Sequence, residues 1–371
     1  MPSMVRGPAF AFAAFGAFWG AWGAALPEIR TSTGASHAAL GLALLCIGFA
    51  ALPAMLVVGR LADRAGGSLL APALAGFGIA AALPGLAASV PALVVALLLV
   101  GASSGAVDVA MNTAVTVAEA RTGQRYMHKL HAVFSLSVLL ASVSVGVLRR
   151  AGVGATLILA VVAGLVMLAA VPNRGGPRPP TRPRDRRLPL RSGSPLVVLG
   201  ALCALAFVLE NALQSWSAVY LETVLGATPA VSGLGPGLFA AAMFTGRALA
   251  QAAGRHATDS ALIAIAGLAA AAGMSAAALA TRPSVALAAF VTGGAGLGLV
   301  APTLFGAAGR AVGEGQRGAA VSTVTTLGYL GFLVGPPLVG AVAEVAGLRG
   351  SLMLMAGLGL VLATCALALR R

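Results

Sequence analysis

The feature that most constrains this chain is a series of twelve long apolar runs separated by short polar stretches. Apolar residues make up 59% of the sequence and charged residues 9%, whereas charged residues make up about 25% of an average soluble domain. A helix of about 20 apolar residues crosses the ~30 Å hydrocarbon core of a bilayer. The sequence therefore predicts an all-α, polytopic membrane protein. The predicted spans are residues 8–27, 37–58, 68–88, 91–119, 131–148, 153–171, 195–216, 230–251, 260–280, 284–308, 319–342 and 350–369.

Lysine and arginine are divided unevenly between the two sides of the predicted membrane. If both termini lie on one side, that side holds 19 of the 24 basic residues and the opposite loops hold five. The positive-inside rule then places both the N- and the C-terminus of this multi-pass membrane protein in the cytoplasm. A net charge of +14 would suggest nucleic-acid binding in a soluble protein, but here it marks cytoplasmic loops, so we expect no nucleic-acid partner. The five basic residues of the opposite, outer loops are Arg30, Arg149, Arg150, Arg282 and Arg349.

A basic, proline-rich stretch divides the sequence into two similar halves. Residues 173–194 contain seven arginines and one acidic residue, Asp185, which predicts a solvated cytoplasmic linker. The halves, 1–172 and 195–371, hold six apolar runs each. Two pseudo-symmetric six-helix bundles are typical of alternating-access carriers, whose substrate site lies at the bundle interface near the midplane. Short matching sequences support the repeat: Gly59-Arg60-Leu61-Ala62 with Gly246-Arg247-Ala248-Leu249, and Gly123-Gln124-Arg125 with Gly315-Gln316-Arg317.

The second apolar run ends in the motif Gly59-Arg60-Leu61-Ala62-Asp63-Arg64-Ala65-Gly66. This motif resembles the signature loop between helices 2 and 3 of the major facilitator superfamily (MFS), which implies the twelve-helix MFS fold. The resemblance also implies a cytoplasmic gate, in which Asp63 faces the N-terminus of helix 11 near residues 318–322. Arg64 would then meet Glu119. The sequence departs from the family pattern where Gly67 and Ser68 replace the usual basic pair. The gating-motif candidates are Gly59, Arg60, Asp63, Arg64, Gly66 and Glu119.

Four further motifs are Asp108-Val109-Ala110-Met111-Asn112, His131-Ala132-Val133-Phe134-Ser135, Trp216-Ser217-Ala218-Val219-Tyr220-Leu221 and Gly328-Tyr329-Leu330-Gly331-Phe332-Leu333-Val334-Gly335-Pro336-Pro337. Together they resemble the YbjJ-type branch of the MFS, a group related to fucose-permease-like sugar carriers. The resemblance spans essentially the whole chain and implies a carrier that works as a monomer. The Gly-Pro motif of helix 5 in drug antiporters is absent from residues 131–148, which disfavours drug efflux.

One acidic residue lies well inside an apolar run. Asp108 falls a few residues past the middle of residues 91–119, and a carboxyl group at that depth is costly and marks a functional site by default. Ser104, Asp108 and Asn112 recur at every fourth position and so share one helix face. We interpret Asp108 as a proton-coupling acid, because fucose-permease-like carriers use an acidic side chain in this helix. The alternative is a carboxyl group that pairs with a neighbouring helix. Asn112 would bind the substrate or Asp108, or act only in helix packing.

A second polar cluster lies about fifteen residues into the seventh run. Glu210 and Gln214 share one face of this predicted helix, and Asn211 and Ser215 form an adjacent stripe. Helix 7 lines the central cavity in the superfamily, so the resemblance implies a substrate-binding cluster, with Glu210 as a second proton-coupling candidate. The alternative is that Glu210 lies near the outer boundary and meets water. Arg247 is interpreted as a gate or snorkelling arginine rather than as a ligand for an anion, since it ends its helix on the cytoplasmic side.

Aromatic residues complete the candidate substrate site. Trp19 and Trp22 in the first run and Tyr329 in the eleventh either stack on a sugar face or anchor the helices at the membrane interface. His131, at the start of a helix, is favoured as a cap or loop contact over a proton relay.

The sequence holds no motif for enzyme chemistry. A phosphate-binding loop is absent, and neither the four histidines nor the three cysteines have metal-site spacing. We therefore predict that the protein is not an enzyme and has no metal and no cofactor.

The sequence thus predicts an MFS secondary active transporter that moves a small solute, sugar-like by preference, by alternating access and proton symport. Its partners would be that solute, protons and the lipid bilayer. The main alternative is an exporter of drugs or metabolites by proton antiport, and a third reading is a membrane receptor that binds without turnover. Uptake of a polar solute predicts a hydrogen-bonding cavity around Asn112, Asn211 and Gln214. Export of hydrophobic compounds instead predicts a cavity lined mainly by Trp, Phe and Met side chains.

Overall fold

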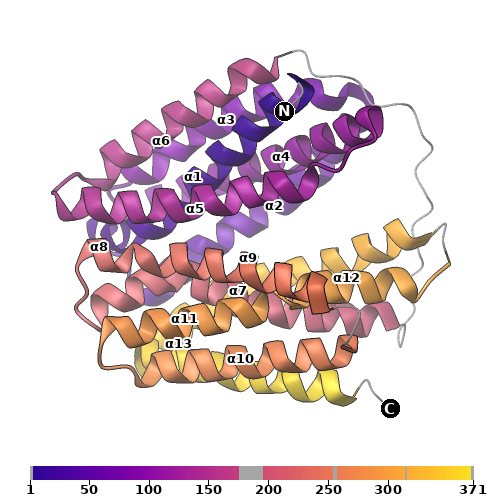
Figure 1. The fold of residues 1–371 in the computed structure, drawn as a ribbon. Coiled ribbons are helices and arrows are strands. Elements are labelled where there is room, and N and C mark those ends of the chain that lie inside the picture. The colour runs from indigo at the N-terminus through magenta and orange to yellow at the C-terminus, as the bar shows by residue number, and fades with distance from the viewer. Residues whose placement is uncertain (1–2, 175–194, 254–256, 314–315, 369–371) are drawn as a thin grey trace. The chain divides into compact units, whose positions relative to one another are not determined.

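The computed structural model describes residues 3–174, 195–253, 257–313 and 316–368, apart from the side chains of residues 3, 63–67, 249–253 and 318. Every regular element in these ranges is helical (Figure 1). The chain divides into two compact units, which are described separately below. Unit 1 comprises Met1–Arg182 with Thr228–Gly237, and unit 2 comprises Pro183–Ala227 with Leu238–Arg371.

Unit 1 is built from six long or apolar helices and their short 3₁₀ extensions. Within it α1 packs along α5, α2 along α4, and α3 along α6. Ser89 caps α4, because its Oγ accepts a hydrogen bond from Ala92 N, and Gly123 ends this helix in the left-handed conformation with φ 67°. The elements are α1 (Ser3–Thr33), α2 (His37–Ala65), η1 (Gly66–Leu69), α3 (Leu70–Ala82), η2 (Leu83–Leu86), α4 (Val90–Thr122), α5 (Met127–Arg150), α6 (Ala155–Ala170) and η3 (Val171–Asn173).

Unit 2 contains the remaining helices, except that α8 and the first residues of α9 pack on α5 and belong to unit 1. In that contact Ser142 Oγ donates a hydrogen bond to Gly233 O. Within unit 2, α7 and α10 both pack along α13. The elements are α7 (Pro195–Thr223), α8 (Pro229–Ser232), α9 (Leu234–Ala253), α10 (Asp259–Leu279), α11 (Pro283–Leu297), α12 (Val300–Arg310) and α13 (Arg317–Ala368).

The helices account for all twelve predicted spans. Nine helical stretches in the described ranges are long and apolar enough to cross a membrane, and α11 with α12 forms one of them. The 52-residue α13 is two helices, because Gly347 breaks it with φ 68° and ψ 170°. The shorter apolar stretch Leu70–Leu86 and α9 supply the other two. The predicted all-α fold of twelve spans is therefore confirmed, and the protein is a multi-pass membrane protein.

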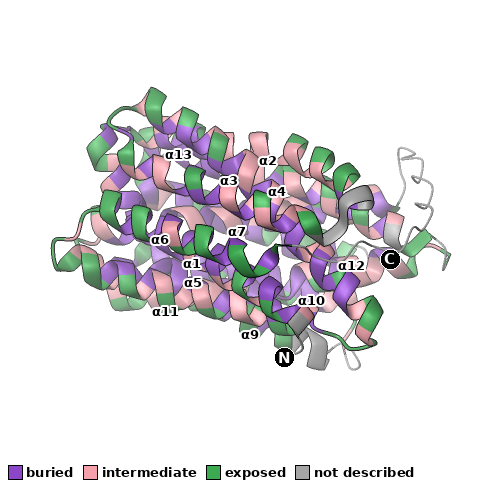
Figure 2. Cartoon of the chain, turned by 90° about the horizontal axis from the view of Figure 1, so that it is seen from above, coloured by how far each residue is buried: buried purple, intermediate pink, exposed green. Residues whose placement is uncertain are grey.

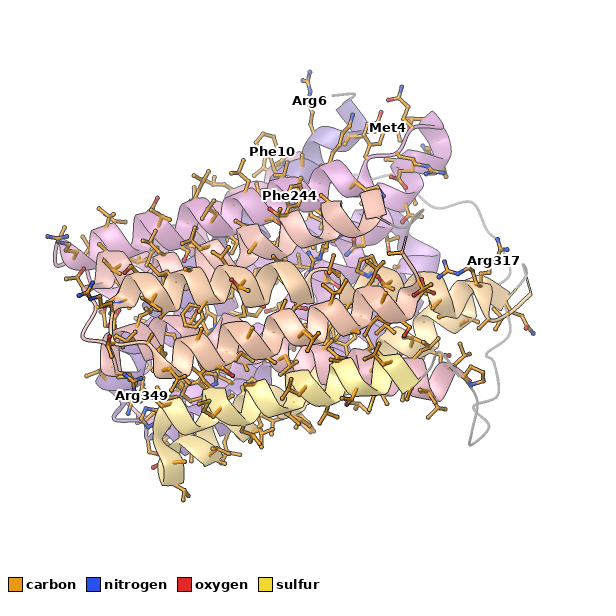
Figure 3. All side chains as sticks on the ribbon, turned by 60° about the horizontal axis from the view of Figure 1, so that its bottom comes forward. Met4, Arg6, Phe10, Phe244, Arg317 and Arg349 are labelled. Carbon is orange, nitrogen blue, oxygen red and sulfur yellow. The ribbon has the colours of Figure 1, made fainter. Side chains whose placement is uncertain are left out.

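Many large apolar side chains of the described helices are exposed, as expected for surfaces that face lipid rather than water. Exposed residues recur along the helices in Figure 2. Phe10 and Phe244 project outward from α1 and α9, with 57% and 43% of their surface exposed (Figure 3). Leucines on other helices are exposed to a similar degree, among them Leu56, Leu140, Leu168 and Leu279.

Charged side chains at one set of loops tie helix ends together. In unit 1, Glu28 Oε2 pairs with Arg149 Nε at 3.1 Å, and Glu28 Oε1 accepts a hydrogen bond from Ala155 N at 2.6 Å, at the start of α6. In unit 2, Arg349 donates to Ala278 O and, at 2.8 Å, to Ala280 O, at the end of α10 (Figure 3). Both contacts are favourable for the helix dipole, because the Glu28 carboxylate lies at the N-terminus of α6 and the Arg349 guanidinium at the C-terminus of α10.

The predicted linker lies almost entirely outside the described residues, which stop at 174 and resume at 195. Its first residue, Asn173, is buried and ends the short 3₁₀ element η3 that follows α6. Asn173 Nδ2 donates to Gly7 O at 2.9 Å and to Ala169 O at 2.8 Å.

Candidate functional site

The first polar site lies in α4, just past the middle of this 33-residue helix. Asp108 and Asn112 are both half-buried. Asn112 Nδ2 donates to Asp108 Oδ1 at 3.2 Å and to the Asp108 backbone O at 2.8 Å. The spacing of four residues along a helix therefore brings the two side chains together, as expected from the sequence.

The carboxylate of Asp108 has no basic partner among the described residues. The ion pairs in that part of the chain include those that join Glu28, Glu210 and Asp259 to arginines, and Asp108 belongs to none of these three. A carboxylate in an apolar span without a cation is unusual, because such groups normally pair with one another or with a counter-charge. The amide of Asn112 is its only hydrogen-bond partner in the described part of the protein.

Ser104 belongs to the same helix face but not to the same contact. Its side chain is 4% exposed, and its Oγ donates to Gly101 O at 3.0 Å within α4. The hydroxyl is thus satisfied one turn below Asp108. The structure brings Asp108 and Asn112 together and leaves Ser104 as part of the helix interior.

Two glycines hold the α4 site against α2. A Cβ atom added at Gly101 would collide with Ile47 O, and one added at Gly105 would lie 2.7 Å from Ala51 O. Only glycine permits this close approach of two backbones. The face of α4 next to Asp108 is therefore fixed by direct backbone packing.

The second polar site lies near the middle of the 29-residue α7, in unit 2. Glu210 Oε1 lies 3.9 Å from Arg247 Nη2 of α9, and the Glu210 side chain is 14% exposed. Glu210 thus has a cationic neighbour, which Asp108 lacks. Because α9 continues beyond Arg247 to Ala253, Arg247 does not end its helix as expected, and it lies close enough to pair with α7.

Asn211 links α7 to α13. Its Nδ2 donates to Phe332 O at 2.9 Å, and its Oδ1 accepts from Ser215 Oγ at 2.8 Å. Pro336 has no N–H, so the carbonyl of Phe332, four residues earlier, has no intrahelical donor. Asn211 supplies the missing donor and is therefore engaged in helix packing. Gln214, on the Glu210 face, is half-buried and has no hydrogen-bond partner among the described residues.

The aromatic candidates lie in clusters within each unit. In unit 1, Trp19 is half-buried and packs edge-on against Phe15 and Phe18, with ring centroids 6.0 and 5.2 Å apart. Trp22 is 4% exposed and lies in the core of unit 1. In unit 2, the half-buried Tyr329 lies 5.7 Å from Phe332, by ring centroids. Trp19 and Tyr329 thus present more surface to a solute than Trp22 does.

The gating motif can be followed only in part. The side chains of Asp63, Arg64 and Gly66 lie outside the described residues, whereas Arg60 is exposed on α2 and Gly59 is half-buried. Glu119 has a role that the sequence did not suggest. Its Oε1 accepts hydrogen bonds from Tyr126 N at 2.5 Å and Met127 N at 2.8 Å, which caps the start of α5.

Two functional features were missed in the sequence, the Glu210–Arg247 pair and the capping role of Glu119. Each joins residues of different helices or of a helix and a loop, which periodicity along one helix does not reveal. A sequence signal existed for the first, because an intramembrane acid predicts a nearby cation.

Comparison with known proteins supports a single family. An uncharacterised MFS-type transporter of Yersinia pestis is 33% identical over 225 residues, which cover 60% of this chain and 58% of that protein, so the match extends over less than two thirds of the relative. The membrane protein MosC of Rhizobium meliloti is 28% identical over 361 residues, 96% of this chain and 87% of that protein.

A solved structure shares the fold. The crystal structure of a mutant of the nucleoside transporter NupG aligns over 100% of both chains with a TM-score of 0.81, at 13% sequence identity. Identity this low shows the fold alone. The sequence profile of the Major Facilitator Superfamily matches residues 9–304, most of the chain. The chain therefore belongs to the Major Facilitator Superfamily.

Proposed function

We propose that this chain is a proton-coupled carrier that takes up a small polar solute, sugar-like by preference, by alternating access. Asp108 would carry the coupled proton. The observation that carries this proposal is the carboxylate of Asp108, which lies inside an apolar span with the Asn112 amide as its described partner. Members of this superfamily are carriers rather than enzymes, which agrees with the absence of an enzyme motif in the sequence.

The physical argument concerns the charge of Asp108. An unpaired carboxylate is costly in an apolar environment, and a bound proton removes that charge. A carrier that must hold this group away from water during its transport cycle is therefore favoured to bind a proton first. Asn112 can donate to the carboxylate in the charged state and accept from the carboxylic acid in the neutral state through its Oδ1.

The proposal of a polar solute is supported by one amide group in each unit, Gln214 in unit 2 and Asn112 in unit 1, each considered separately. Gln214 has an amide without a described partner, and the Oδ1 of Asn112 is not used in a described hydrogen bond. Such groups suit the hydroxyls of a sugar-like molecule. The excess of arginine on one side of the spans supports cytoplasmic termini in a bacterial inner membrane. We propose that the carrier works as a monomer.

Export of lipophilic compounds by proton antiport is the second candidate, and the aromatic clusters favour it. In unit 1 the ring of Phe15 on α1 lies between rings from two other helices. Its centroid is 5.4 Å from that of Phe77 on α3 and 5.9 Å from that of Phe134 on α5. Their surfaces would suit a hydrophobic substrate better than a sugar.

The first test is proton flux in reconstituted liposomes that contain a trapped pH dye. External polar solutes are screened one by one, and acidification of the lumen on addition of a sugar identifies proton symport. If no polar solute changes the luminal pH but lipophilic cations do, the protein would instead be assigned to export by proton antiport.

The second test is Asp108→Asn in the same liposomes. We expect normal insertion, loss of accumulation driven by a pH gradient, and retained exchange of solute across the membrane. Asp259→Asn is the matched control, because Asp259 is also a carboxylate but pairs with Arg310 at a helix end and is 42% exposed. Accumulation by Asp108→Asn at the wild-type level would remove Asp108 from the mechanism.

A further inference from the structure

The pair of Glu210 and Arg247 is more widely spaced than two other ion pairs of the described residues, Glu28 with Arg149 and Asp259 with Arg310. In those pairs a guanidinium nitrogen lies 3.1 Å from Glu28 or 2.5 Å from Asp259. Arg247 Nη2 lies 3.9 Å from Glu210 Oε1, beyond hydrogen-bond distance. The guanidinium group therefore makes no hydrogen bond to a described residue, although it lies in a membrane-spanning helix and its side chain is 42% exposed.

The backbone beneath this side chain is fixed. A Cβ atom added at Gly298 would lie 3.1 Å from Arg247 N, and one added at Gly246 would collide with Ala295 O. The contact lies beside the interruption between α11 and α12. Arg247 thus combines a rigid backbone position with unused donors, which is the arrangement that a binding residue requires.

The chemistry of the donor selects the ligand. Guanidinium presents planar N–H donors that match a carboxylate in a bidentate manner. The neighbour of Arg247 is already a carboxylate, but it is held too far away to form these hydrogen bonds. A carboxylate on a solute could approach closer and satisfy the donors that Glu210 leaves unused.

We propose that Arg247 binds the carboxylate group of an anionic solute, in competition with Glu210. This inference rests on the proposed function as a solute carrier, and it narrows the substrate from any polar solute to one that carries a carboxylate, such as a sugar acid. Gln214 shares a helix face with Glu210 and is placed to bind the hydroxyls of the same molecule.

The test uses the full-length protein in a neutral detergent without added lipid, so that no proton gradient is involved. Thermal unfolding is measured with matched neutral and carboxylate solutes: glucose and glucuronate, and glycerol and glycerate. In the wild type we expect at least one carboxylate, and neither neutral twin, to raise Tm in a concentration-dependent manner.

Three variants test the roles of the two residues. Arg247→Gln should weaken binding of the carboxylate at least tenfold, and Arg247→Lys should restore part of it. Glu210→Gln should tighten binding severalfold, because the competing negative charge is removed. A purely structural ion pair would give the opposite result for Glu210→Gln, with a lower Tm and no gain in affinity.

The inference is overturned if no carboxylate protects the wild type, or if protection is unchanged in Arg247→Gln. A second set of samples, with anionic lipid added to the detergent in place of the solutes, tests the other source of an anionic group, and the inference is also overturned if only this lipid protects the protein through Arg247. These outcomes are separable from failure of proton coupling. If Asp108→Asn loses solute accumulation but the wild type binds no carboxylate solute, the proposed function is kept and the inference about Arg247 is rejected. Arg247-dependent carboxylate binding without any proton flux would do the reverse.

Discussion

At the scale of single residues, a polar side chain inside a span can be explained by the backbone group that it hydrogen-bonds. The Phe332 carbonyl loses its helical donor to Pro336 and regains one from Asn211 of α7. In lipid no water can replace that donor, so a side chain from a neighbouring helix must do so. Asn211 was a candidate for substrate binding, and in this structure its Nδ2 donates to the backbone carbonyl of Phe332 in α13.

Asn211→Ala is therefore expected to destabilise the protein by about 1–3 kcal/mol, because it leaves the half-buried carbonyl of Phe332 without a partner. The measurement is the Tm of the purified protein in detergent. Pro336→Ala provides the control, since it restores an N–H four residues after Phe332. In that background Asn211→Ala should cost less, and an equal cost in both backgrounds would contradict this role.

The candidate site shows what periodicity can and cannot predict. The spacing of four residues placed Asp108 and Asn112 on one helix face, and a hydrogen bond between them was one of the alternatives considered for Asn112. The approach of Arg247 to Glu210 was not predicted, because it depends on how α7 and α9 pack and on the reach of a long side chain.

At the scale of helices, glycine decides which pairs pack most closely. Gly101 and Gly105 bring α4 against carbonyls of α2, and Gly331 brings α13 against Ala204 O of α7. Where lipid surrounds the helices, close backbone packing replaces the hydrophobic effect as a source of stability. The proposed proton site in α4 thus depends on two residues that have no side chain.

Gly101→Ala should destabilise the protein by about 1–3 kcal/mol, because the added methyl group would collide with Ile47 O. Gly164→Ala is the matched control in α6, where an added Cβ meets nothing within 4 Å. There the exchange should be neutral or stabilise the helix by up to about 1 kcal/mol. The two Tm shifts are expected to have opposite signs or clearly different sizes. Equal shifts would show that helix propensity rather than packing dominates.

The apolar runs predicted the helices because length and composition alone decide whether a segment can cross a bilayer. They predicted the ends less well, since helices extend into polar residues. A loop was expected between residues 342 and 350, but α13 remains helical up to the single break at Gly347. A left-handed glycine reverses the chain direction without a longer polar segment.

At the scale of the whole molecule, the arrangement of charge predicts the orientation of every span. Of the 24 basic residues, the five on the predicted outer side include Arg149 and Arg349, which bind helix ends in the structure. Packing therefore explains why Arg149 and Arg349 lie on the predicted outer side. The excess of basic residues on the other side is what predicts the topology.

This orientation predicts the outcome of reporter fusions along the chain in a bacterial host. Green fluorescent protein should fluoresce when fused after Arg371 or within residues 175–194, because both positions are predicted to be cytoplasmic. Alkaline phosphatase should be active after Gly34, Gly152 or Gly226, since each lies in a turn on the predicted outer side, and inactive after Gly123. Gly123 is the matched control, because it is also a left-handed glycine at a helix end but lies one span away. Active phosphatase at Gly123 or in the linker would invert the topology. The proton released from Asp108 would then enter the opposite compartment, so this experiment fixes the direction in which the proposed coupling operates.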